Sequence, residues 1–467
     1  MAKHRIERDT LGEIKVPEAA AWGAQTQRAV ENFPVSGLRA HPALIRAHVM
    51  VKLAAARANV DLGKLDKKLA AAIDQACQEV LDGKLLDQWV VDVFQAGAGT
   101  SFNMNTNEVL ANRASEILGS PLGTYKPVHP NDHVNMSQST NDTFPTAMQL
   151  AAILLGLELI EILEELADEF AAKGQEFDAI IKSGRTHLQD AVPVRLGQEF
   201  LAWSLAIHRG AERLAAALDE CRELPLGGSA VGTGFNTHPE YSAKAIEHLS
   251  EISSEELGPP LDLRAAMQSM APMGAVSSAL RGLALELIRI SGDLRLLASG
   301  PRTGLAEILL PAVQPGSSIM PGKVNPSMAE CLSMVAMQVV GCDAAVALAV
   351  QAGQLELNVM MPAIAFNVLF SMEILKNFLP VFSARCLRGI TADADRCRRY
   401  FETSVGLATL LNEHIGYAKA AEIAKESVKT GKTLPELILE KKLMTEADLA
   451  KALDAKFVTE PNDVQKK

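Results

Sequence analysis

The sequence predicts a mainly helical fold built on a bundle of long helices. Three stretches, residues 146–181, 273–297 and 328–350, keep the spacing of an apolar helical face over many turns. Helices of this length usually belong to bundles. The alternation with a period of two that a large sheet requires appears nowhere at length. Only 4% of the residues are aromatic, so small aliphatic side chains must form the core between closely spaced helices.

Composition narrows the class of protein. The 467 residues provide room for two or three domains, and 48% apolar with 22% charged residues is typical of a soluble globular chain. The net charge of −11 argues against a nucleic-acid-binding surface, which would be basic. A pocket on such a protein can still be locally positive, so an anionic substrate remains compatible with this charge.

The sequence also favours a cytoplasmic protein without a membrane span. The first ten residues are charged throughout, unlike a signal peptide. The most apolar helical segment, residues 150–163, is interrupted by Glu158 and Glu161 and falls short of a span. The six cysteines have no zinc-binding spacing, so we expect buried thiols in a reducing compartment and no metal site.

The predicted elements follow one another along the chain. Residues 1–45 are expected to be irregular with short extended pieces, because Pro17, Pro34 and Pro42 interrupt them. Gly83 ends the second predicted helix. One helix follows a glycine turn and is predicted to end at residue 118. The other helices are predicted at residues 44–60, 64–81, 146–181, 196–220, 273–297, 328–350, 359–378, 418–429, 434–441 and 446–455.

A first polar cluster follows the glycine turn of residues 97–99. The glycines would let backbone N–H groups meet an anion at a helix start, with Thr100 and Ser101 beside it. Asparagines at positions 103, 105 and 107 cannot all face one way on a helix. We expect some of them to be buried and to hold backbone groups of neighbouring segments.

Two further clusters lie at predicted helix ends. Residues 129–142 are dense in short hydrogen-bonding side chains, among them Ser139, Thr140 and Asn141. Asn141 or Asp142 could cap the following helix, and a solvated loop with such a cap is the alternative to a site. Residues 184–190 contain Thr186 and His187, and this histidine could be structural or catalytic.

The fourth cluster is the loop of residues 316–326. Its glycines permit unusual backbone angles, and Pro315, Pro321 and Pro326 exclude helix through most of it. We predict a lid or catalytic loop rather than an ordinary connector with a surface lysine. Its functional side chains would be Ser317, Ser318, Lys323 and Asn325.

These residue types suit a small dicarboxylate substrate and require no cofactor. The glycine-rich residues 227–234 lack the order of a dinucleotide loop and follow no strand. No metal-ligand set and no nucleophile elbow is present. Lys323 and Asn325 could hold one carboxylate, and hydroxyls with backbone N–H groups could hold the other.

Four segments together resemble the aspartase/fumarase superfamily. They are GSSIMPGKVNP at 316–326, GTSFNMNTNE at 99–108, SQSTND at 137–142 and GRTHLQD at 184–190. The resemblance covers essentially the whole chain. It implies an all-α homotetramer with a twenty-helix core and active sites shared among three subunits. It also implies three domains, at residues 1–138, 139–395 and 396–467.

Within the superfamily, the sequence resembles aspartate ammonia-lyases more than class II fumarases. Ala98, Thr140, residues 354–360 and residues 431–449 are similar to the former. Residues 129–132 and 227–229 are similar to the latter. We therefore expect deamination of L-aspartate to fumarate, with hydration of fumarate as the alternative. A non-catalytic bundle is a third hypothesis, and the intact set of polar residues argues against it.

The resemblance also implies the role of each site residue. Ser317, as an alkoxide, would remove a proton from C3 and leave an enediolate. The β-carboxylate would be held at Thr100, Ser139, Thr140 and Ser318, with Ser101 at the same anion site. Lys323, Asn325 and Thr186 would hold the α-carboxylate, and the amino group would contact Asn141 and His187.

Overall fold

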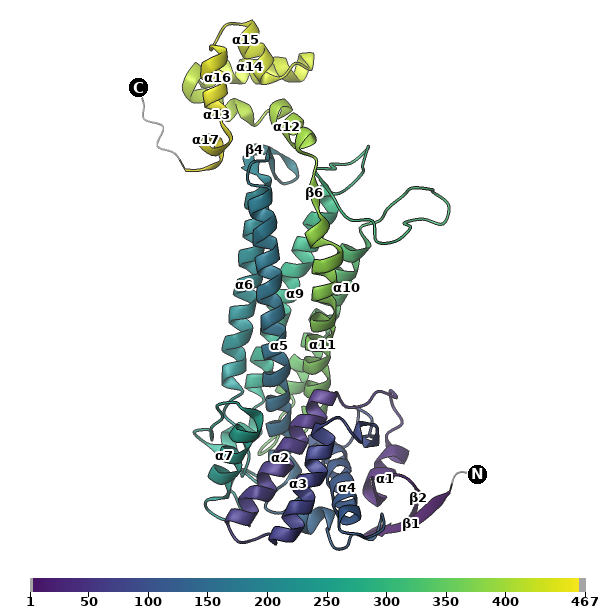
Figure 1. The fold of residues 1–467 in the computed structure, drawn as a ribbon. Coiled ribbons are helices and arrows are strands. Elements are labelled where there is room, and N and C mark those ends of the chain that lie inside the picture. Colours follow the sequence, from purple (N-terminus) through teal and green to yellow (C-terminus); the bar gives the residue numbers. More distant parts are fainter. Residues whose placement is uncertain (1–2, 462–467) are drawn as a thin grey trace. The chain divides into compact units, whose positions relative to one another are not determined.

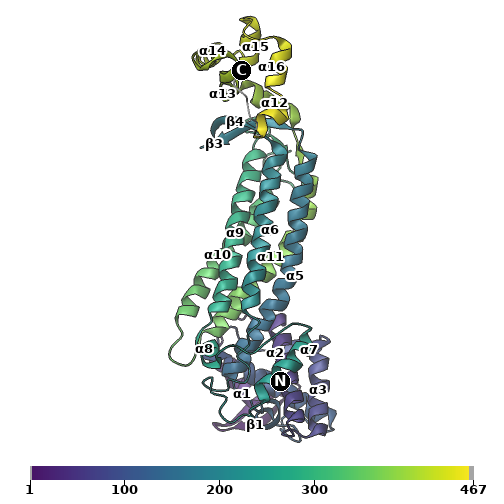
Figure 2. The same ribbon diagram turned by 90° about the vertical axis from the view of Figure 1, so that its left-hand side faces the viewer.

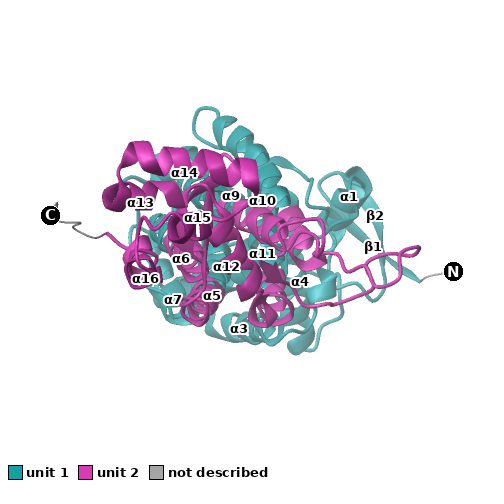
Figure 3. Ribbon diagram, turned by 90° about the horizontal axis from the view of Figure 1, so that it is seen from above, with its two compact units in different colours: residues 1–160, 212–284, 337–376 teal, residues 161–211, 285–336, 377–467 magenta. Residues whose placement is uncertain are grey.

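The computed structural model describes residues 3–461, which divide into two compact units. Each unit is assembled from three segments of the chain (Figure 3). Unit 1 contains residues 1–160, 212–284 and 337–376, and unit 2 contains residues 161–211, 285–336 and 377–467. The division into three domains predicted from the sequence stays a prediction.

Five long helices provide most of the structure, as the sequence predicts. Each unit contains a stretch of every one of them, and these stretches run side by side (Figures 1 and 2). Their buried side chains are mostly Ala, Leu, Ile, Val and Met, which confirms the expected aliphatic core. The helices are α5 (Thr140–Glu176), α6 (Leu196–Glu220), α9 (Ala271–Leu297), α10 (Ser327–Gln351) and α11 (Met361–Arg385).

Unit 1 adds shorter helices and one antiparallel strand pair. Pro42 stands at the start of α2 and the ring of His41 caps that helix, which explains why it begins there. The elements are β1 (His4–Asp9), β2 (Gly12–Pro17), α1 (Ala24–Asn32), α2 (Pro42–Asp61), α3 (Lys67–Leu81), η1 (Leu86–Gln88), η2 (Gly97–Gly99), α4 (Thr100–Ile117), η3 (Pro130–Val134), α7 (Tyr241–Ser253) and α8 (Leu263–Gln268).

Unit 2 adds two strand pairs and the C-terminal helices. The capping box of Thr433 and Glu436 begins α15, and Gly431 in a left-handed conformation ends α14. The elements are β3 (Ile181–Thr186), β4 (Gln189–Arg195), β5 (Ile308–Leu309), η4 (Leu387–Gly389), β6 (Thr391–Ala392), α12 (Ala394–Thr403), α13 (Leu407–Ile415), α14 (Tyr417–Thr430), α15 (Leu434–Glu440), α16 (Glu446–Ala452) and α17 (Ala455–Thr459).

The sequence did not predict the β3–β4 hairpin. Its two turn residues, His187 and Leu188, have φ of 54° and 59°, as a tight hairpin turn demands. Gly184 is required in β3, since a Cβ there would lie 2.5 Å from the carbonyl oxygen of Val192. All strands among residues 3–461 form two-stranded sheets, so the all-α class holds.

Three helical segments are long and apolar enough to cross a membrane, judged by length and composition alone. They are α5, α10 and Met361–Gly389. The expectation that no segment reaches this threshold is therefore wrong, because it considered only residues 150–163. In α5, 67% of the most apolar 18-residue segment is buried by other parts of residues 3–461. The predicted absence of a membrane partner stays a prediction.

Helix α4 carries a buried row of polar side chains that organises unit 1. Asn105 accepts the N–H of Val90 at 3.0 Å and donates to the carbonyl of Gln88 at 3.0 Å. Asn112 donates to the carbonyl of Ala21 at 2.7 Å. These contacts confirm that asparagines of this helix hold backbone groups of neighbouring segments.

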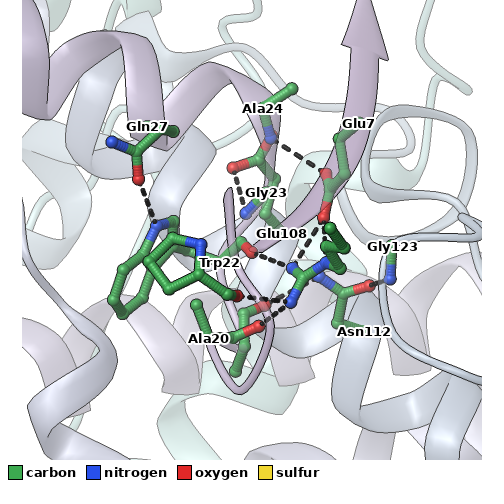
Figure 4. A network of polar contacts seen from close by, with 12 residues as sticks. Glu7, Ala20, Trp22, Gly23, Ala24, Gln27, Glu108, Asn112 and Gly123 are labelled. Carbon is green, nitrogen blue, oxygen red and sulfur yellow. Dashed lines mark hydrogen bonds and ion pairs between the residues drawn. The ribbon is translucent and has the colours of Figure 1, made fainter. Parts of the chain in front are cut away.

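Glu108 attaches the start of α1 to α4 (Figure 4). Its carboxylate accepts the backbone N–H groups of Gly23 at 2.9 Å, Gln25 at 2.9 Å and Thr26 at 3.1 Å. These are N–H groups that the first turn of a helix leaves without partners. Burial raises the pKa of Glu108, and the three donors oppose that shift.

Replacing Glu108 with Gln should destabilise unit 1 by about 2 kcal/mol. The amide keeps one acceptor oxygen and turns an NH₂ group toward backbone donors. Urea denaturation followed by tryptophan fluorescence measures the loss, because Trp22 lies next to Gly23. The control is Glu116→Gln, an exposed position on the same helix. Equal stability of the two variants would contradict this role for Glu108.

Candidate active site

The start of α4 is built around Gly99. Its φ is +82°, and a Cβ there would lie 2.2 Å from the ring of Phe144 in the first turns of α5. The turn before it is held because the N–H of Ala98 donates to the carbonyl of Val359 at 2.8 Å. Only glycine permits this approach, so the beginnings of α4 and α5 pack directly against each other.

The two hydroxyls predicted at this helix start differ in exposure. Thr100 is the first residue of α4 and is exposed, whereas Ser101 is buried. The hydroxyl of Thr100 donates to the carbonyl of Gly97 at 3.3 Å. Thr100 therefore presents its oxygen lone pairs at the protein surface, and its O–H can rotate from the Gly97 carbonyl toward a ligand.

Ser139 caps α5, which corrects the expectation that Asn141 or Asp142 would do so. Its hydroxyl accepts the N–H of Asn141 at 3.2 Å, while Asp142 accepts the N–H of Ser139 at 2.9 Å. The reciprocal pattern resembles a capping box, in which a serine side chain begins the helix and an acid reaches back. Thr140 is the first residue of the helix and is buried.

Asp142 also fastens the glycine-rich loop of residues 227–234 to α5. Its second carboxylate oxygen accepts the N–H groups of Gly227 at 3.1 Å and Ser229 at 2.9 Å. The side chain is fully buried, and burial raises its pKa to about 6 although three backbone donors oppose the shift. Residues 227–234, which the sequence analysis rejected as a dinucleotide-binding loop, therefore pack beside the start of α5.

Asn141 contacts the same loop. Its Nδ2 donates to the carbonyl of Ala230 at 2.9 Å. That bond fixes the orientation of the amide, so the oxygen Oδ1 is the atom left to meet a ligand. An acceptor in this position suits an ammonium group.

The loop of residues 316–326 lies in unit 2 and is closed at its neck. The N–H of Gly316 donates to the carbonyl of Lys323 at 2.9 Å, and Nδ2 of Asn325 donates to the carbonyl of Gly316 at 2.6 Å. A Cβ on Gly316 would lie 2.4 Å from the Lys323 carbonyl oxygen, so this neck requires glycine. The amide of Asn325 thus shapes the loop.

Ser317 is half-buried at the loop tip, where two backbone donors face it. Its Oγ accepts the N–H of Ile319 at 3.2 Å and of Met320 at 3.0 Å. Such donors favour negative charge on the oxygen. Ser317 and Lys323 line one open cavity of about 450 Å³, and Lys323 and Ser318 are exposed.

Thr186 and His187 lie at the exposed turn of the β3–β4 hairpin in unit 2. The hairpin is held by Glu307, a fully buried carboxylate that forms ion pairs with Lys182 at 2.7 Å and Arg185 at 2.8 Å. Glu307 immediately precedes β5, the strand that leads into the 316–326 loop. The hairpin with His187 and the stem of the serine loop therefore share one anchor.

The predicted site residues thus fall into two groups. Unit 1 brings together Thr100, Ser101, Ser139, Thr140 and Asn141 at two adjacent helix starts, which attract anions. Unit 2 contains Thr186, His187 and the four loop residues. In residues 3–461 no group of three His, Cys, Asp or Glu side chains is placed to hold a metal ion.

Sequence reasoning missed two buried charged residues beside these groups, Lys52 and Glu307. Both are fully buried. The available signal for Lys52 was a single charge in the apolar run of residues 49–56. Glu307 stands between Ala306 and Ile308, a similarly apolar setting.

Comparisons with known proteins match the chain over nearly its full length. Residues 12–341 match the family model described as Lyase, and residues 407–460 match the model described as Fumarase C C-terminus. An aspartate ammonia-lyase of Bacillus sp is 48% identical, with 98% of each chain covered. A class II fumarate hydratase of Halobacterium salinarum is also 48% identical, over 98% of this chain and 97% of that one.

A solved structure agrees with the fold. The crystal structure of a fumarate lyase:delta crystallin from Brucella melitensis bound to cobalt superposes with a TM-score of 0.95 at 48% identity. It covers 98% of this chain and 100% of that chain.

Replacing Asp142 with Asn should release the 227–229 loop and lower both stability and activity. The amide cannot accept all three backbone N–H groups, so we expect a loss of about 2 kcal/mol and at least about tenfold in turnover. Urea denaturation and a turnover assay measure the two effects. Asp168→Asn, an exposed position on the same helix, should change neither.

The stability difference should also depend on pH. The pKa of Asp142 is raised in the folded protein to about 6, so its contribution is fully present below pH 4 and is lost as the pH rises through 6. The difference in unfolding free energy between wild type and Asp142→Asn should be about 2 kcal/mol smaller at pH 7 than at pH 4. A difference that stays constant across this range would contradict the raised pKa.

Proposed function

Because this chain belongs to the aspartase/fumarase superfamily of lyases, we propose that it is an ammonia-lyase that converts L-aspartate reversibly to fumarate and ammonia. The observation that carries the proposal is similarity along almost the whole chain to proteins named aspartate ammonia-lyase, at 48% identity for two of them. The orientation of Asn141, whose free Oδ1 suits an ammonium group, supports the same choice.

The β-carboxylate of the substrate would bind at the paired helix starts of unit 1. There Thr100, Ser101, Ser139 and Thr140 offer hydroxyls at the N-terminal ends of two helices, where the helix dipoles favour negative charge. The intermediate in this reaction is a dianionic enediolate on that carboxylate. Donors that are fixed before the charge develops stabilise such an intermediate most strongly.

Ser317 would act as the base on C3 of the substrate. The N–H groups of Ile319 and Met320 that already point at its Oγ would stabilise the alkoxide. The alkoxide takes the C3 proton, and the electrons of the C–H bond move into the enediolate. When the enediolate collapses, the C2–N bond breaks and ammonia leaves on the opposite face. Ser318 would add a donor to the β-carboxylate.

The other end of the substrate would be held by cationic and amide groups. Lys323 shares a cavity with Ser317 and would pair with the α-carboxylate, with Asn325 and Thr186 beside it. His187 and Asn141 would contact the amino group. His187 is exposed at its hairpin turn, which leaves both ring nitrogens available to a ligand.

We further propose a cytoplasmic homotetramer whose active sites combine residues of three subunits. Several large apolar side chains on the long helices remain exposed in the single chain, and packing against further copies would bury them. They include Leu201 and Leu205 on α6, Leu285 and Leu296 on α9, and Met334, Met337 and Leu348 on α10. Five of the six thiols are buried, which suits a reducing compartment.

Class II fumarate hydratase is the second candidate. The Halobacterium salinarum protein of that name has the same 48% identity to this chain as the Bacillus protein. Dehydration of L-malate, the reverse of hydration, would use the same base and the same carboxylate contacts, but its leaving hydroxide needs a proton, which His187 could supply through a water molecule.

An ultraviolet assay for fumarate separates the two candidates. Purified protein is given L-aspartate in one sample and L-malate in another. We expect fumarate from L-aspartate, with an equal amount of ammonia released. Fumarate from L-malate alone would establish the hydratase instead, and no fumarate from either would reject both.

Ser317→Ala should lower turnover of the active substrate by about 10³-fold, because it removes the general base. Succinate binding, measured by calorimetry, should change by less than about threefold, since the carboxylate contacts remain. Ser278→Ala on the exposed face of α9 is the matched control and should have near wild-type turnover. Near wild-type turnover of Ser317→Ala would exclude this base.

A further inference from the structure

Lys52 is a fully buried cation in the middle of α2. Its ammonium donates to Oδ1 of Asn103 at 2.7 Å, to Oδ1 of Asn135 at 2.9 Å and to Oε1 of Gln138 at 3.0 Å. An ammonium group has three donors, and each of them meets one amide oxygen here. The surroundings are therefore built for the protonated form of this lysine.

The three amides belong to the two segments that form the dicarboxylate half-site of unit 1. Asn103 lies on α4, one turn after Thr100, whereas Asn135 and Gln138 lie in the turn that leads into Ser139. Asn103 Nδ2 and Asn107 Nδ2 also donate to Oδ1 of Asn135, at 3.3 and 3.1 Å. The ammonium thus lies at the centre of a network that joins α4 to the turn before α5.

The charges around Lys52 have opposing effects. Burial lowers the pKa of Lys52 to about 7, and the carboxylate of Asp142 and the thiol of Cys77 raise it in part. His48, one turn earlier on α2, is held neutral because burial lowers its pKa well below the ordinary value. Because burying a charge has a large cost in desolvation, this ammonium is weak evidence for stability, and a role in fixing the geometry of its three partners is the hypothesis that the contacts favour.

We propose that Lys52 is a positioning residue of the active site, which holds the hydroxyls at the α4 start and those at the α5 start in a single geometry. The inference rests on the proposed function, because it assumes that these two helix starts bind the β-carboxylate together. Lys52 does not touch the substrate. It acts through Asn103 on one side and through Asn135 and Gln138 on the other.

A matched pair of substitutions at Gln138 isolates the link. Nε2 of Gln138 donates to the carbonyls of Val134 and Met136, and both Gln138→Glu and Gln138→Leu remove those bonds. Only the leucine variant also removes the acceptor for Lys52. We expect Gln138→Leu to have a kcat about tenfold below that of Gln138→Glu, with KM values within about threefold of each other.

Lys52→Met removes the ammonium itself, so Oε1 of Gln138 loses its lysine donor and the oxygens of Asn103 and Asn135 each lose one of their donors. We expect kcat to fall about 100-fold, since small displacements of donors around a developing charge have effects of this size. Lys173→Met is the control, because Lys173 is also a buried lysine but bonds Glu176 and the carbonyl of Ile390 in unit 2. That variant should lose stability with a kcat near wild type.

The outcomes separate this inference from the proposed function. Equal kcat values for Gln138→Leu and Gln138→Glu would overturn the role of Lys52 while wild-type turnover of L-aspartate still supported the ammonia-lyase. If Lys52→Met does not fold, the Gln138 pair decides alone.

If wild type turns over neither L-aspartate nor L-malate, succinate binding by calorimetry replaces kcat. Binding by Gln138→Leu about tenfold weaker than by Gln138→Glu would then support the link, and equal or absent binding would overturn it.

Discussion

The structure of unit 1 depends on one constraint, which is that every polar group carried into the interior must find a partner there. Helix α4 runs through the core with asparagine, threonine and glutamate side chains that are almost fully buried. Many of their partners are backbone groups at the ends of short elements and in the segments between them, within residues 20–26 and 88–90. The helix therefore determines where these segments lie.

The same constraint produces the candidate anion site. The buried side chains of α4 bond to neighbouring segments, whereas Thr100, its first residue, is exposed, so the N-terminal end of the helix dipole is accessible there. Gly99 and Phe144 bring the first turn of α5 against it. Each helix start alone would attract an anion weakly, and here the N-terminal ends of α4 and α5 lie next to each other. Lys52 and Asp142 are buried behind these two helix ends.

The sequence predicted the long helices well, because their apolar spacing is sustained over many turns and tertiary contacts only reinforce it. It failed where several local choices were equally plausible, and where long-range contacts decide. The β3–β4 hairpin depends on two residues with positive φ that carry no glycine signal, and Ser139 caps α5 although Asn141 and Asp142 are equally good capping types. The candidate site residues were chosen from their motifs, and their roles stay predictions. Lys52 could not, because nothing local shows that its three partners lie on other segments.

The two units suggest a division between fixed and movable parts of the chemistry. Groups that recognise a carboxylate gain from rigidity, and those of unit 1 stand on helices with buried polar supports. The proposed base stands instead on a loop whose neck is held by Gly316, Lys323 and Asn325, while its tip residues Ile319 and Met320 are exposed. Since, within residues 3–461, the bonds recorded for Ser317 Oγ come from N–H groups of its own loop, that geometry can move as one piece. A base that keeps its stabilising donors while the loop moves could approach C3 without losing its activation.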